Sequence, residues 1–340
     1  VSMLFHLSTV HSVTAAIMRF FFRRKLIQLL LTLPSVALLS FLLLQFSPID
    51  PVRAYIGADM LQVSQEQRQQ IAARWGLDEP PLMRYLHWQK EILSGNMGTS
   101  LLFQEPVTKV IARRFIPSLA LMGAAWLLSG VIGFILGVIA GLRQNSLADR
   151  LIRLYAYTLA STPAFWLGML LVIIFSVQLG WTPVCCAYPP GMSPEQVSLG
   201  QWLLHLLLPA ATLSIISVAN VTLHTRQKLL EVLETDFILF ARAKGESAWG
   251  GFRRHALRHV LLPALTIQFA SFGELFGGSI LAEQVFSYPG LGQATVQAGL
   301  GGDVPLLLGI VLVSCVFVFF GNTIADLLYT VVDPRLRRTV

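Results

Sequence analysis

Two carboxylates in otherwise apolar stretches are the side chains of this sequence best placed to do chemistry. Glu274 lies in the segment FGELFGG, and Asp326 lies near the end of the last apolar stretch. An ionisable side chain inside a membrane span is costly to bury, which makes it a candidate for function. Glu274 could line a path for a cationic or metal-bearing solute, or its protonated carboxyl could bond to a neighbouring helix. For Asp326 we favour a structural pairing with an arginine of a loop.

Three amides are weaker candidates for residues that line such a path. They are Asn220, Gln268 and Asn322. Buried amides in membrane spans more often join helices, and that interpretation stays open for each of them. No catalytic residues are predicted, because a membrane-embedded enzyme needs a nucleophile with a base, or paired acids at one depth. Glu274 and Asp326, by contrast, are expected at different depths.

The histidines and cysteines do not have the spacing of a metal site. His255 and His259 stand at i and i+4, which can bind metal, but their polar surroundings favour solvated or interface histidines. Cys185 and Cys186 are adjacent, and Cys315 lies in an apolar run, so no CxxC pair exists. We expect unpaired or packing thiols, with a vicinal disulfide as the alternative if that loop faces an oxidising compartment.

The composition is that of an integral membrane protein. The chain has 340 residues, of which 54% are hydrophobic and 13% charged, with a mean hydropathy of +0.65. Soluble domains carry about 25% charged residues. The net charge of +7 could suggest nucleic-acid binding, but the basic residues lie in short loops between apolar stretches, which is the positive-inside pattern.

The apolar stretches predict an all-α fold with six transmembrane helices and both termini in the cytoplasm. The predicted spans are 26–46, 117–142, 154–179, 202–223, 263–281 and 305–331. On this layout 17 of the 25 Lys and Arg residues are cytoplasmic, and the other eight fall in one long external segment. The predicted divisions are an extension (1–18), a cytoplasmic start with the first span (19–46), an external subdomain (47–115) and a membrane core (116–338).

Small and helix-breaking residues predict local features of these elements. Five glycines from Gly123 to Gly141 recur at near-helical spacing, which lets helices approach closely in lipid. The triplet at 161–163, Ser-Thr-Pro, interrupts the third span. In the external subdomain we expect two short surface helices, at 64–77 and 81–93.

A polar segment of about forty residues, 224–262, separates the fourth and fifth spans. It holds seven of the 25 basic residues, interleaved with four acidic ones. It is too short for a catalytic domain of its own but long enough for two or three short helices. Gly245, Gly250 and Gly251 are the expected breaks between them. Such a segment is suited to being gripped by a partner at the membrane surface.

Within that segment, Ala241-Arg242-Ala243-Lys244-Gly245 resembles the cytoplasmic loop of ABC importer membrane subunits, in the branch of peptide and nickel permeases. The downstream HALR at 255–258 and Leu-Pro at 262–263 resemble the same branch. Further resemblances occur in order along about residues 19–338. They are GLDEPPL at 76–82, GTS at 98–100, STPAFWLG at 161–168, LLPAATL at 207–213, EQVFSYPGLG at 283–292, DVP at 303–305 and DLLYTVVDPRLR at 326–337.

This resemblance implies the type I ABC importer permease fold in a bacterial inner membrane. It implies four kinds of partner: a homologous second permease subunit, two cytosolic ATP-binding subunits, an extracytoplasmic solute-binding protein and the lipid bilayer. The sequence contains no GxxxxGK[ST] motif, so the chain is expected to bind no cofactor, with ATP and Mg²⁺ on the ATPase subunits.

The resemblance also implies that a short helix ending at Gly245 couples this chain to the ATPase. Phe237, Phe240 and Ala241 are expected to share one docking face of that helix. The predicted coupling residues are Asp236, Phe237, Phe240, Ala241, Arg242, Ala243, Lys244, Gly245 and Arg258. The alternative is an amphipathic helix that lies on lipid headgroups.

The solute is left open between nickel, metal chelates, dipeptides and oligopeptides. GELFGG looks more like the nickel and metal-chelate subgroup, so it favours a metal-bearing solute. Two other classes remain as alternatives to a permease: a non-transporting membrane scaffold or receptor, and a membrane-embedded enzyme.

Overall fold

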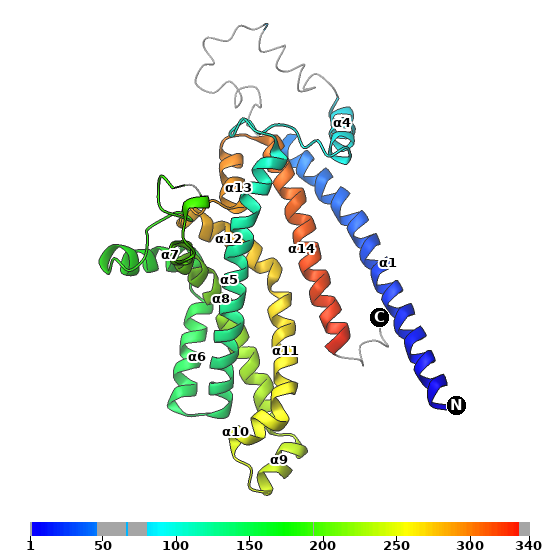
Figure 1. Ribbon diagram of the computed structural model, residues 1–340, viewed down its shortest axis with the longest axis vertical. Coiled ribbons are helices and arrows are strands. Elements are labelled where there is room, and N and C mark those ends of the chain that lie inside the picture. Colours follow the sequence, from blue (N-terminus) through cyan, green and yellow to red (C-terminus); the bar gives the residue numbers. More distant parts are fainter. Residues whose placement is uncertain (1, 46–65, 67–79, 193, 333–340) are drawn as a thin grey trace. The chain divides into compact units, whose positions relative to one another are not determined.

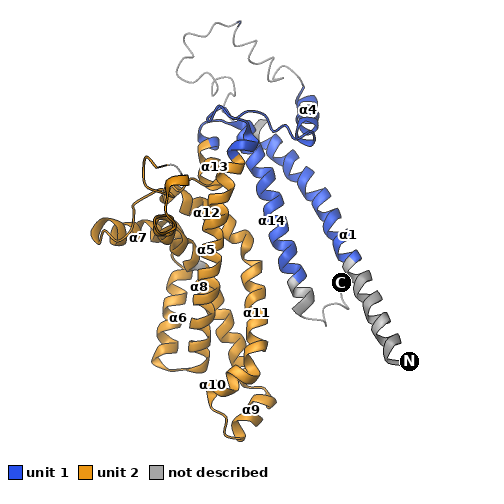
Figure 2. Ribbon diagram, in the orientation of Figure 1, with its two compact units in different colours: residues 1–110, 298–340 blue, residues 111–297 orange. Residues whose placement is uncertain are grey.

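The structure is a computed structural model that describes residues 2–45, 66, 80–192 and 194–332 (Figure 1). The regular elements of these residues are helices, and the β-pairing among them is one isolated bridge between Thr99 and Pro106. The chain forms two compact units, residues 1–110 with 298–340 and residues 111–297 (Figure 2). The surface helix predicted at 64–77 lies outside the described residues.

Unit 1 takes its helices from both ends of the chain. They are α1 (Ser2–Gln45), α4 (Pro81–Leu93) and α14 (Val304–Val332). The helix predicted at 81–93 is therefore confirmed as α4. Helix α1 packs against α14, and Lys25 of α1 forms an ion pair with Asp326 of α14. Asp326 thus makes the predicted structural pairing, but with a lysine of the first helix instead of a loop arginine.

Unit 2 contains the remaining helices. They are α5 (Val107–Leu142), α6 (Leu147–Ala160), α7 (Ala164–Leu171), α8 (Leu199–Leu233), α9 (Asp236–Ala243), α10 (Ala248–Gly251), α11 (Leu257–Ala270), α12 (Phe272–Val285) and α13 (Leu291–Leu300). Of these, α5 and α13 extend past its borders into unit 1. Two π-helical stretches, Val172–Gln178 and Phe252–Ala256, extend α7 and precede α11.

Hydropathy and length select three single helices and three bent pairs as candidate membrane spans among the described residues. The single helices are Arg19–Leu43, Val107–Leu142 and Val304–Leu327. The bent pairs match the predicted third, fourth and fifth spans. Helix α6 meets α7 at 108°, with the break at the predicted Ser-Thr-Pro triplet. The predicted interruption of the third span is therefore confirmed, whereas the size of the bend was not predicted.

Several helices are longer than the apolar stretches from which they were predicted. Helix α5 begins at Val107 instead of 117, so it takes in the end of the predicted external subdomain. Helix α8 continues to Leu233, ten residues beyond the predicted end at 223. Hydropathy marks only the part of a helix that contacts hydrocarbon, and a helix can continue into polar surroundings without a break. The predicted segment 224–262 is therefore a separate module only from about residue 234.

The glycines of α5 allow α8 to approach closely. A Cβ atom added to Gly133, Gly137 or Gly141 would lie 2.6–2.7 Å from side-chain atoms of α8. The α8 residues they meet are Val221, Thr225 and Leu229. These glycines stand four residues apart, so they form one smooth stripe against which the second helix packs. The predicted role of the glycine spacing is confirmed for these three positions.

Two buried carboxylates explain three of the sequence motifs. In unit 1, Asp303 is fully buried and caps α14, accepting a bond from the Leu306 N–H at 3.1 Å. Its other oxygen accepts bonds from the Ser100 hydroxyl and from the Leu102 N–H at 3.0 Å. The motifs GTS and DVP are thus two sides of one contact. A buried carboxylate that accepts three hydrogen bonds is well compensated for its lost hydration.

In unit 2, Glu283 of the motif EQVFSYPGLG is also a buried carboxylate that accepts hydrogen bonds from distant parts of the chain. Its carboxylate accepts bonds from the Ser118 hydroxyl at 2.6 Å and the Gln293 N–H at 3.0 Å. The side chain is fully buried. A Cβ atom on Gly290 would lie 2.3 Å from this carboxylate, and one on Gly292 would lie 3.0 Å from it. The motif therefore needs glycines at these positions because the glutamate occupies the space beside the turn.

Between α7 and α8, the structure joins Cys185 and Cys186 in a vicinal disulfide, the alternative that the sequence left open. The Cys186 N–H donates to the Phe286 carbonyl at 2.8 Å. Nδ1 of His205 lies 3.1 and 3.2 Å from the carbonyl oxygens of the two cysteines. The disulfide therefore lies in a loop that is fixed to both α8 and the turn after α12.

Candidate functional site: the α9–α10 surface and its support

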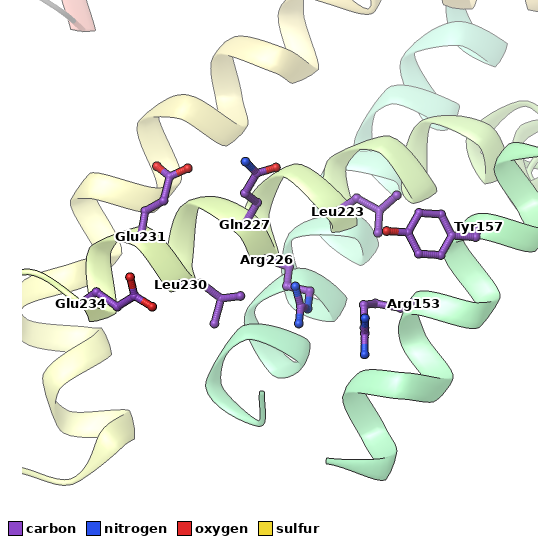
Figure 3. Close-up of a pocket in the computed structure, with 8 residues that line it drawn as sticks. All are labelled: Arg153, Tyr157, Leu223, Arg226, Gln227, Leu230, Glu231 and Glu234. Carbon is purple, nitrogen blue, oxygen red and sulfur yellow. The ribbon is translucent and has the colours of Figure 1, made fainter. Parts of the chain in front are cut away.

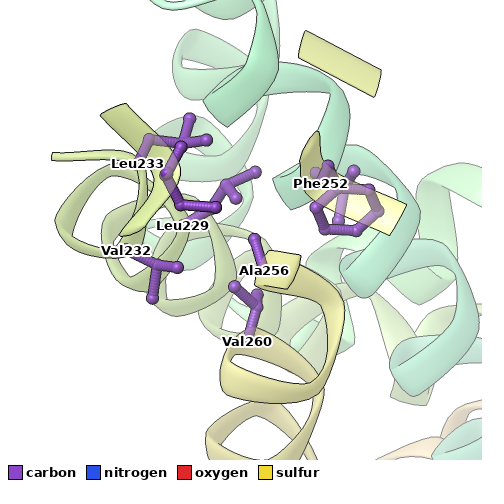
Figure 4. Close-up of a cluster of buried hydrophobic side chains, with 8 residues drawn as sticks. Leu229, Val232, Leu233, Phe252, Ala256 and Val260 are labelled. Carbon is purple, nitrogen blue, oxygen red and sulfur yellow. The ribbon is translucent and has the colours of Figure 1, made fainter. Parts of the chain in front are cut away.

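A hydrophobic cluster fastens the α9–α10 segment to the ends of α5, α8 and α11. Its labelled members in Figure 4 are Leu229, Val232, Leu233, Phe252, Ala256 and Val260. Ile238 of α9 belongs to the same cluster and is 1% exposed. Burying a side chain of this size stabilises the packing by roughly 1.5–3 kcal/mol. The segment is therefore a fixed projection of unit 2.

Helix α9 presents aromatic side chains away from that cluster. Phe237 is 44% exposed and Phe240 is 62% exposed, whereas Ala241 is only 7% exposed. Ala241 and Ile238 stand at i and i+3 and form the buried face. The prediction that Phe237 and Phe240 lie on an accessible face is consistent with this geometry, but the placement of Ala241 on that face was wrong. Its methyl group packs inward because the cluster lies on that side.

The end of α9 follows the glycine-based geometry that the sequence indicated. Gly245 has a φ of +90°. Its N–H donates to the Arg242 carbonyl at 2.9 Å, and the Glu246 N–H donates to the Ala241 carbonyl at 3.2 Å. These two bonds form a Schellman motif, in which glycine tolerates the left-handed conformation. Gly250 and Gly251, by contrast, lie inside α10 and do not form breaks, so that prediction was wrong.

The other predicted coupling residues are on the surface. Asp236, Arg242, Ala243 and Lys244 are exposed on α9 or directly after it, and Arg258 is exposed on α11. Lys244 also lies over the ring of Phe240, with Nζ 4.4 Å from the ring centre. This cation–π contact holds the lysine beside the most exposed aromatic residue of the helix.

Glu246 braces the turn between α9 and α10. Its carboxylate lies 3.2 Å from Arg254 and 3.4 Å from His255. Desolvation would raise the pKa of Glu246, but the hydrogen bonds from His255 and Arg254 outweigh it, so its pKa lies below the usual value. Trp249, on α10, is 59% exposed. Trp249 was not among the predicted coupling residues, although a tryptophan in a polar segment just before Gly250-Gly251 and Arg253-Arg254 was a usable signal.

The two histidines at i and i+4 do not point to a common site. His255 contacts Glu246, whereas the ring of His259 packs against Phe237 with ring centres 5.5 Å apart. A π-helical turn, Phe252–Ala256, precedes His259 and changes the i, i+4 geometry. No group of three or more potential metal ligands occurs among the described residues. The histidines thus have the surface and contact roles that the sequence favoured.

The predicted path residues lie on four different helices. Gln268 is 3% exposed and joins α11 to α5, donating to the Trp126 carbonyl at 2.6 Å and to the Ser129 hydroxyl at 2.9 Å. It has the helix-joining role that was the alternative for the amides. Asn220 is half-buried in α8, Glu274 is exposed on α12, and Asn322 is exposed on α14 in the other unit.

Sequence patterns did not predict an ion pair between the start of α6 and the second half of α8. Asp149 is fully buried and accepts bonds from Nε and Nη2 of Arg226 at 2.6 and 2.9 Å. The Asn145 N–H also donates to Asp149 at 2.9 Å. The bidentate geometry is the strong form of an arginine–carboxylate pair. Asp149 stands in a loop-like sequence, and nothing in its neighbours marks it as buried.

A groove lies between the α5–α6 turn and α9. Its volume is about 630 Å³, and its charged lining includes Arg143, Glu234 and Arg242. Arg242 therefore contributes to a concave surface beside the exposed aromatic residues of α9. An apolar projection next to a charged groove is an arrangement suited to docking a folded partner.

Comparison with known proteins agrees with this architecture. Residues 133–338 match the family of binding-protein-dependent transport system inner membrane components, and residues 17–122 match the amino-terminal domain of the same systems. The chain is 34% identical over 304 residues to the oligopeptide transport system permease protein AppB of Bacillus subtilis, covering 88% of this chain and 94% of that protein. A Brucella abortus protein, provisionally named a peptide transport system permease, is 36% identical over 302 residues, covering 89% of this chain and 94% of that protein.

Among solved structures, an inward-facing form of the MetNI methionine ABC transporter shares the fold. The TM-score is 0.55 at 18% sequence identity, and the alignment covers 66% of this chain and 97% of that chain. The helical architecture, the motif geometry and these matches lead to one assignment. The chain belongs to the family of binding-protein-dependent transport system inner membrane components and is a multi-pass permease subunit, not itself an enzyme, of an ABC importer of the peptide/nickel branch.

Proposed function

We propose that this permease subunit imports di- and oligopeptides and is driven through the exposed face of α9. The observation that carries the coupling part is the fixed mounting of that helix. Ile238 belongs to the cluster beneath it and Ala241 is also buried, while Phe237 and Phe240 are exposed. A helix anchored on one face and apolar on the other can transmit force from a partner, because it cannot rotate or slide independently.

The peptide part of the proposal is supported by the relatives, which carry peptide or oligopeptide permease names at 34–36% identity. The nickel or metal-chelate alternative keeps one observation in its favour. Glu274 is an exposed carboxylate on α12, in an otherwise apolar segment. A carboxylate there could meet a cation.

In this proposal two permease subunits, this one and a homologue, enclose the path. Two cytosolic ATPase subunits hold ATP and Mg²⁺, and a solute-binding protein delivers the peptide from outside. The α9–α10 segment and both termini face the cytoplasm, as the distribution of 17 of 25 basic residues favours. The external subdomain then includes α4 and ends where α5 begins.

Uptake assays test the substrate. Cells with and without this subunit are given labelled di- and tripeptides and, separately, labelled nickel, free and chelated. We expect peptide uptake to be lost on deletion and nickel uptake to be unchanged. If deletion removes only nickel uptake, and Glu274→Gln also reduces nickel uptake, the transported solute is a metal and not a peptide.

Charge-reversal variants test the coupling. Arg242→Glu and Gly245→Asp are expected to reduce uptake and substrate-stimulated ATP hydrolysis at an unchanged amount of protein in the membrane. Arg150→Glu is the matched control, since Arg150 is exposed on α6 and does not line the groove beside α9. Normal uptake by both α9 variants would contradict docking through this helix, and equal loss in the control would point to a general effect of charge.

A further inference from the structure

A cavity of about 340 Å³ lies along α8 on the side of α6, in the half of α8 that leads to α9 (Figure 3). Arg153 and Tyr157 of α6 line one end of it. Glu231 and Glu234 of α8 line the other end, and Leu230 lies between Glu234 and Arg226 (Figure 3). Its volume is within the range of sites for small molecules. No sequence motif and no predicted site residue falls in this cavity.

The α6 end of the cavity carries an uncompensated positive charge. Arg226 uses two of its nitrogens to bond both oxygens of Asp149, which also accepts a backbone bond. Arg153 lies 3.4 Å from the same carboxylate, yet its buried Nε has no hydrogen-bond partner. Two guanidinium groups thus share one saturated carboxylate. An anion in the cavity could accept bonds from Arg153, and the Tyr157 hydroxyl is a further donor at that end.

The opposite end carries negative charge. Glu231 is paired with Lys228 at 2.9 Å, and Glu234 is exposed at the carboxyl end of α8. A ligand that matches this cavity therefore has an anionic group at one end and a cationic group at the other. A small ligand of a single charge would leave one end of the cavity without a partner.

The separation of the two ends sets the length of the ligand. Arg226 shares Asp149 with Arg153 at the same end of the cavity and is eight residues from Glu234 on α8, which corresponds to about 12 Å along the helix. An extended chain spans about 3.3–3.6 Å per residue, so a peptide of three residues places its termini at this distance. Leu223 and Leu230, which also line the cavity, would contact its side chains.

We propose that this cavity binds a short peptide with free termini, its carboxylate on Arg153 and its ammonium group on Glu234, as a second site separate from the transport path. The choice of a peptide over other zwitterions rests on the proposed import function. The charge pattern of the cavity is independent of that function. Occupancy would brace α6 against the part of α8 that supports α9. A peptide accumulating on this side could then act back on the importer that delivered it.

Binding of trialanine to the assembled importer, without its solute-binding protein, tests the site in phosphatidylcholine nanodiscs. We expect Arg153→Gln and Glu234→Gln each to weaken a component of this binding at least tenfold. N-acetylation or carboxyl amidation of trialanine should remove the same component. Arg150→Gln is the matched control on α6 and should leave it unchanged. Trialanine that binds in the transport path should bind both site variants equally, so the binding that remains in the variants is subtracted from that of the wild type.

An equal affinity in wild type, Arg153→Gln and Glu234→Gln would overturn the inference. A phosphatidylethanolamine headgroup has the same charge pattern, so the experiment is repeated in nanodiscs containing that lipid. If trialanine binding falls with its content and Arg153→Gln removes the dependence, the occupant is the lipid and the peptide assignment is overturned. Peptide uptake is measured in parallel. If peptides are taken up but neither site variant changes trialanine binding, only this inference is contradicted. If the site variants weaken binding but peptides are not taken up, only the import proposal is contradicted.

Discussion

Removing the charge of Asp149 should destabilise unit 2 far more than removing an exposed carboxylate of the same chain. Asp149 is fully buried, and the Arg226 side chain is 16% exposed. Asp149→Asn keeps the size of the side chain but leaves Arg226 without its anion. Breaking a buried pair in this way costs about 3–5 kcal/mol. We expect the lower end, about 3 kcal/mol, because the freed guanidinium can reach water at the adjacent cavity.

The measurement is the apparent melting temperature of the purified subunit in detergent. For a unit of this size, about 1 kcal/mol shifts Tm by roughly 2–4 °C, so Asp149→Asn should lower it by about 6–12 °C. The matched control is Glu231→Gln, which removes the exposed pair with Lys228. Exposed pairs contribute about 0–1 kcal/mol, so that change should stay within about 4 °C.

A double variant shows whether the effect belongs to the pair. In Asp149→Asn with Arg226→Gln, neither buried charge remains, so the loss should be smaller than the sum of the two single losses. Additive losses, or a Tm change in Asp149→Asn no larger than in Glu231→Gln, would refute the view that this buried pair holds α6 to α8.

Three further predictions concern contacts described above. Gly137→Val should overpack α5 against α8 at a cost of about 1–3 kcal/mol, and should therefore reduce the yield of folded protein, measured by size-exclusion chromatography. Gly123→Val should leave that yield unchanged, because a Cβ atom at Gly123 meets nothing within 4 Å. Gly290→Ala should displace the Glu283 carboxylate and expose the following turn to proteolysis, and unchanged protection would contradict the packing role. The partners of Glu246 lower its pKa, so its ionised carboxylate stabilises the fold above the ordinary pKa of 4.5, and this stabilisation is lost as the pH falls through the lowered pKa. Hydrogen exchange of residues 244–252 should therefore rise in that acidic range in wild type and not in Glu246→Gln.

The membrane helices could be predicted from the sequence because each is marked by local composition. Hydropathy located the six apolar stretches, the proline at 163 located the break between α6 and α7, and Gly245 located the end of α9. These signals act within one or two helical turns. The 108° angle at the break depends on what α7 packs against, and no local pattern carries that information.

The buried carboxylates could not be predicted because their partners are distant in the sequence. Asp149 and Arg226 are 77 residues apart, and Ser100 and Asp303 are 203 residues apart. The faces of α9 were ambiguous for a different reason. In an eight-residue helix, Phe237 with Phe240 and Ile238 with Ala241 are both apolar pairs at i and i+3, so periodicity does not decide which pair is buried.

The composition of unit 1 from both ends of the chain has a consequence for biosynthesis. Helix α1 is the first described helix to leave the ribosome, and α14, its packing partner in unit 1, is the last. Unit 2 is continuous from residue 111 to 297, so its helices can assemble as they are inserted. Lys25 and the turn at Ser100 must wait for Asp326 and Asp303 until translation is nearly finished. A truncated chain that lacks α14 would therefore present an unpaired α1 to the quality-control proteases of the membrane, although its unit 2 is largely complete.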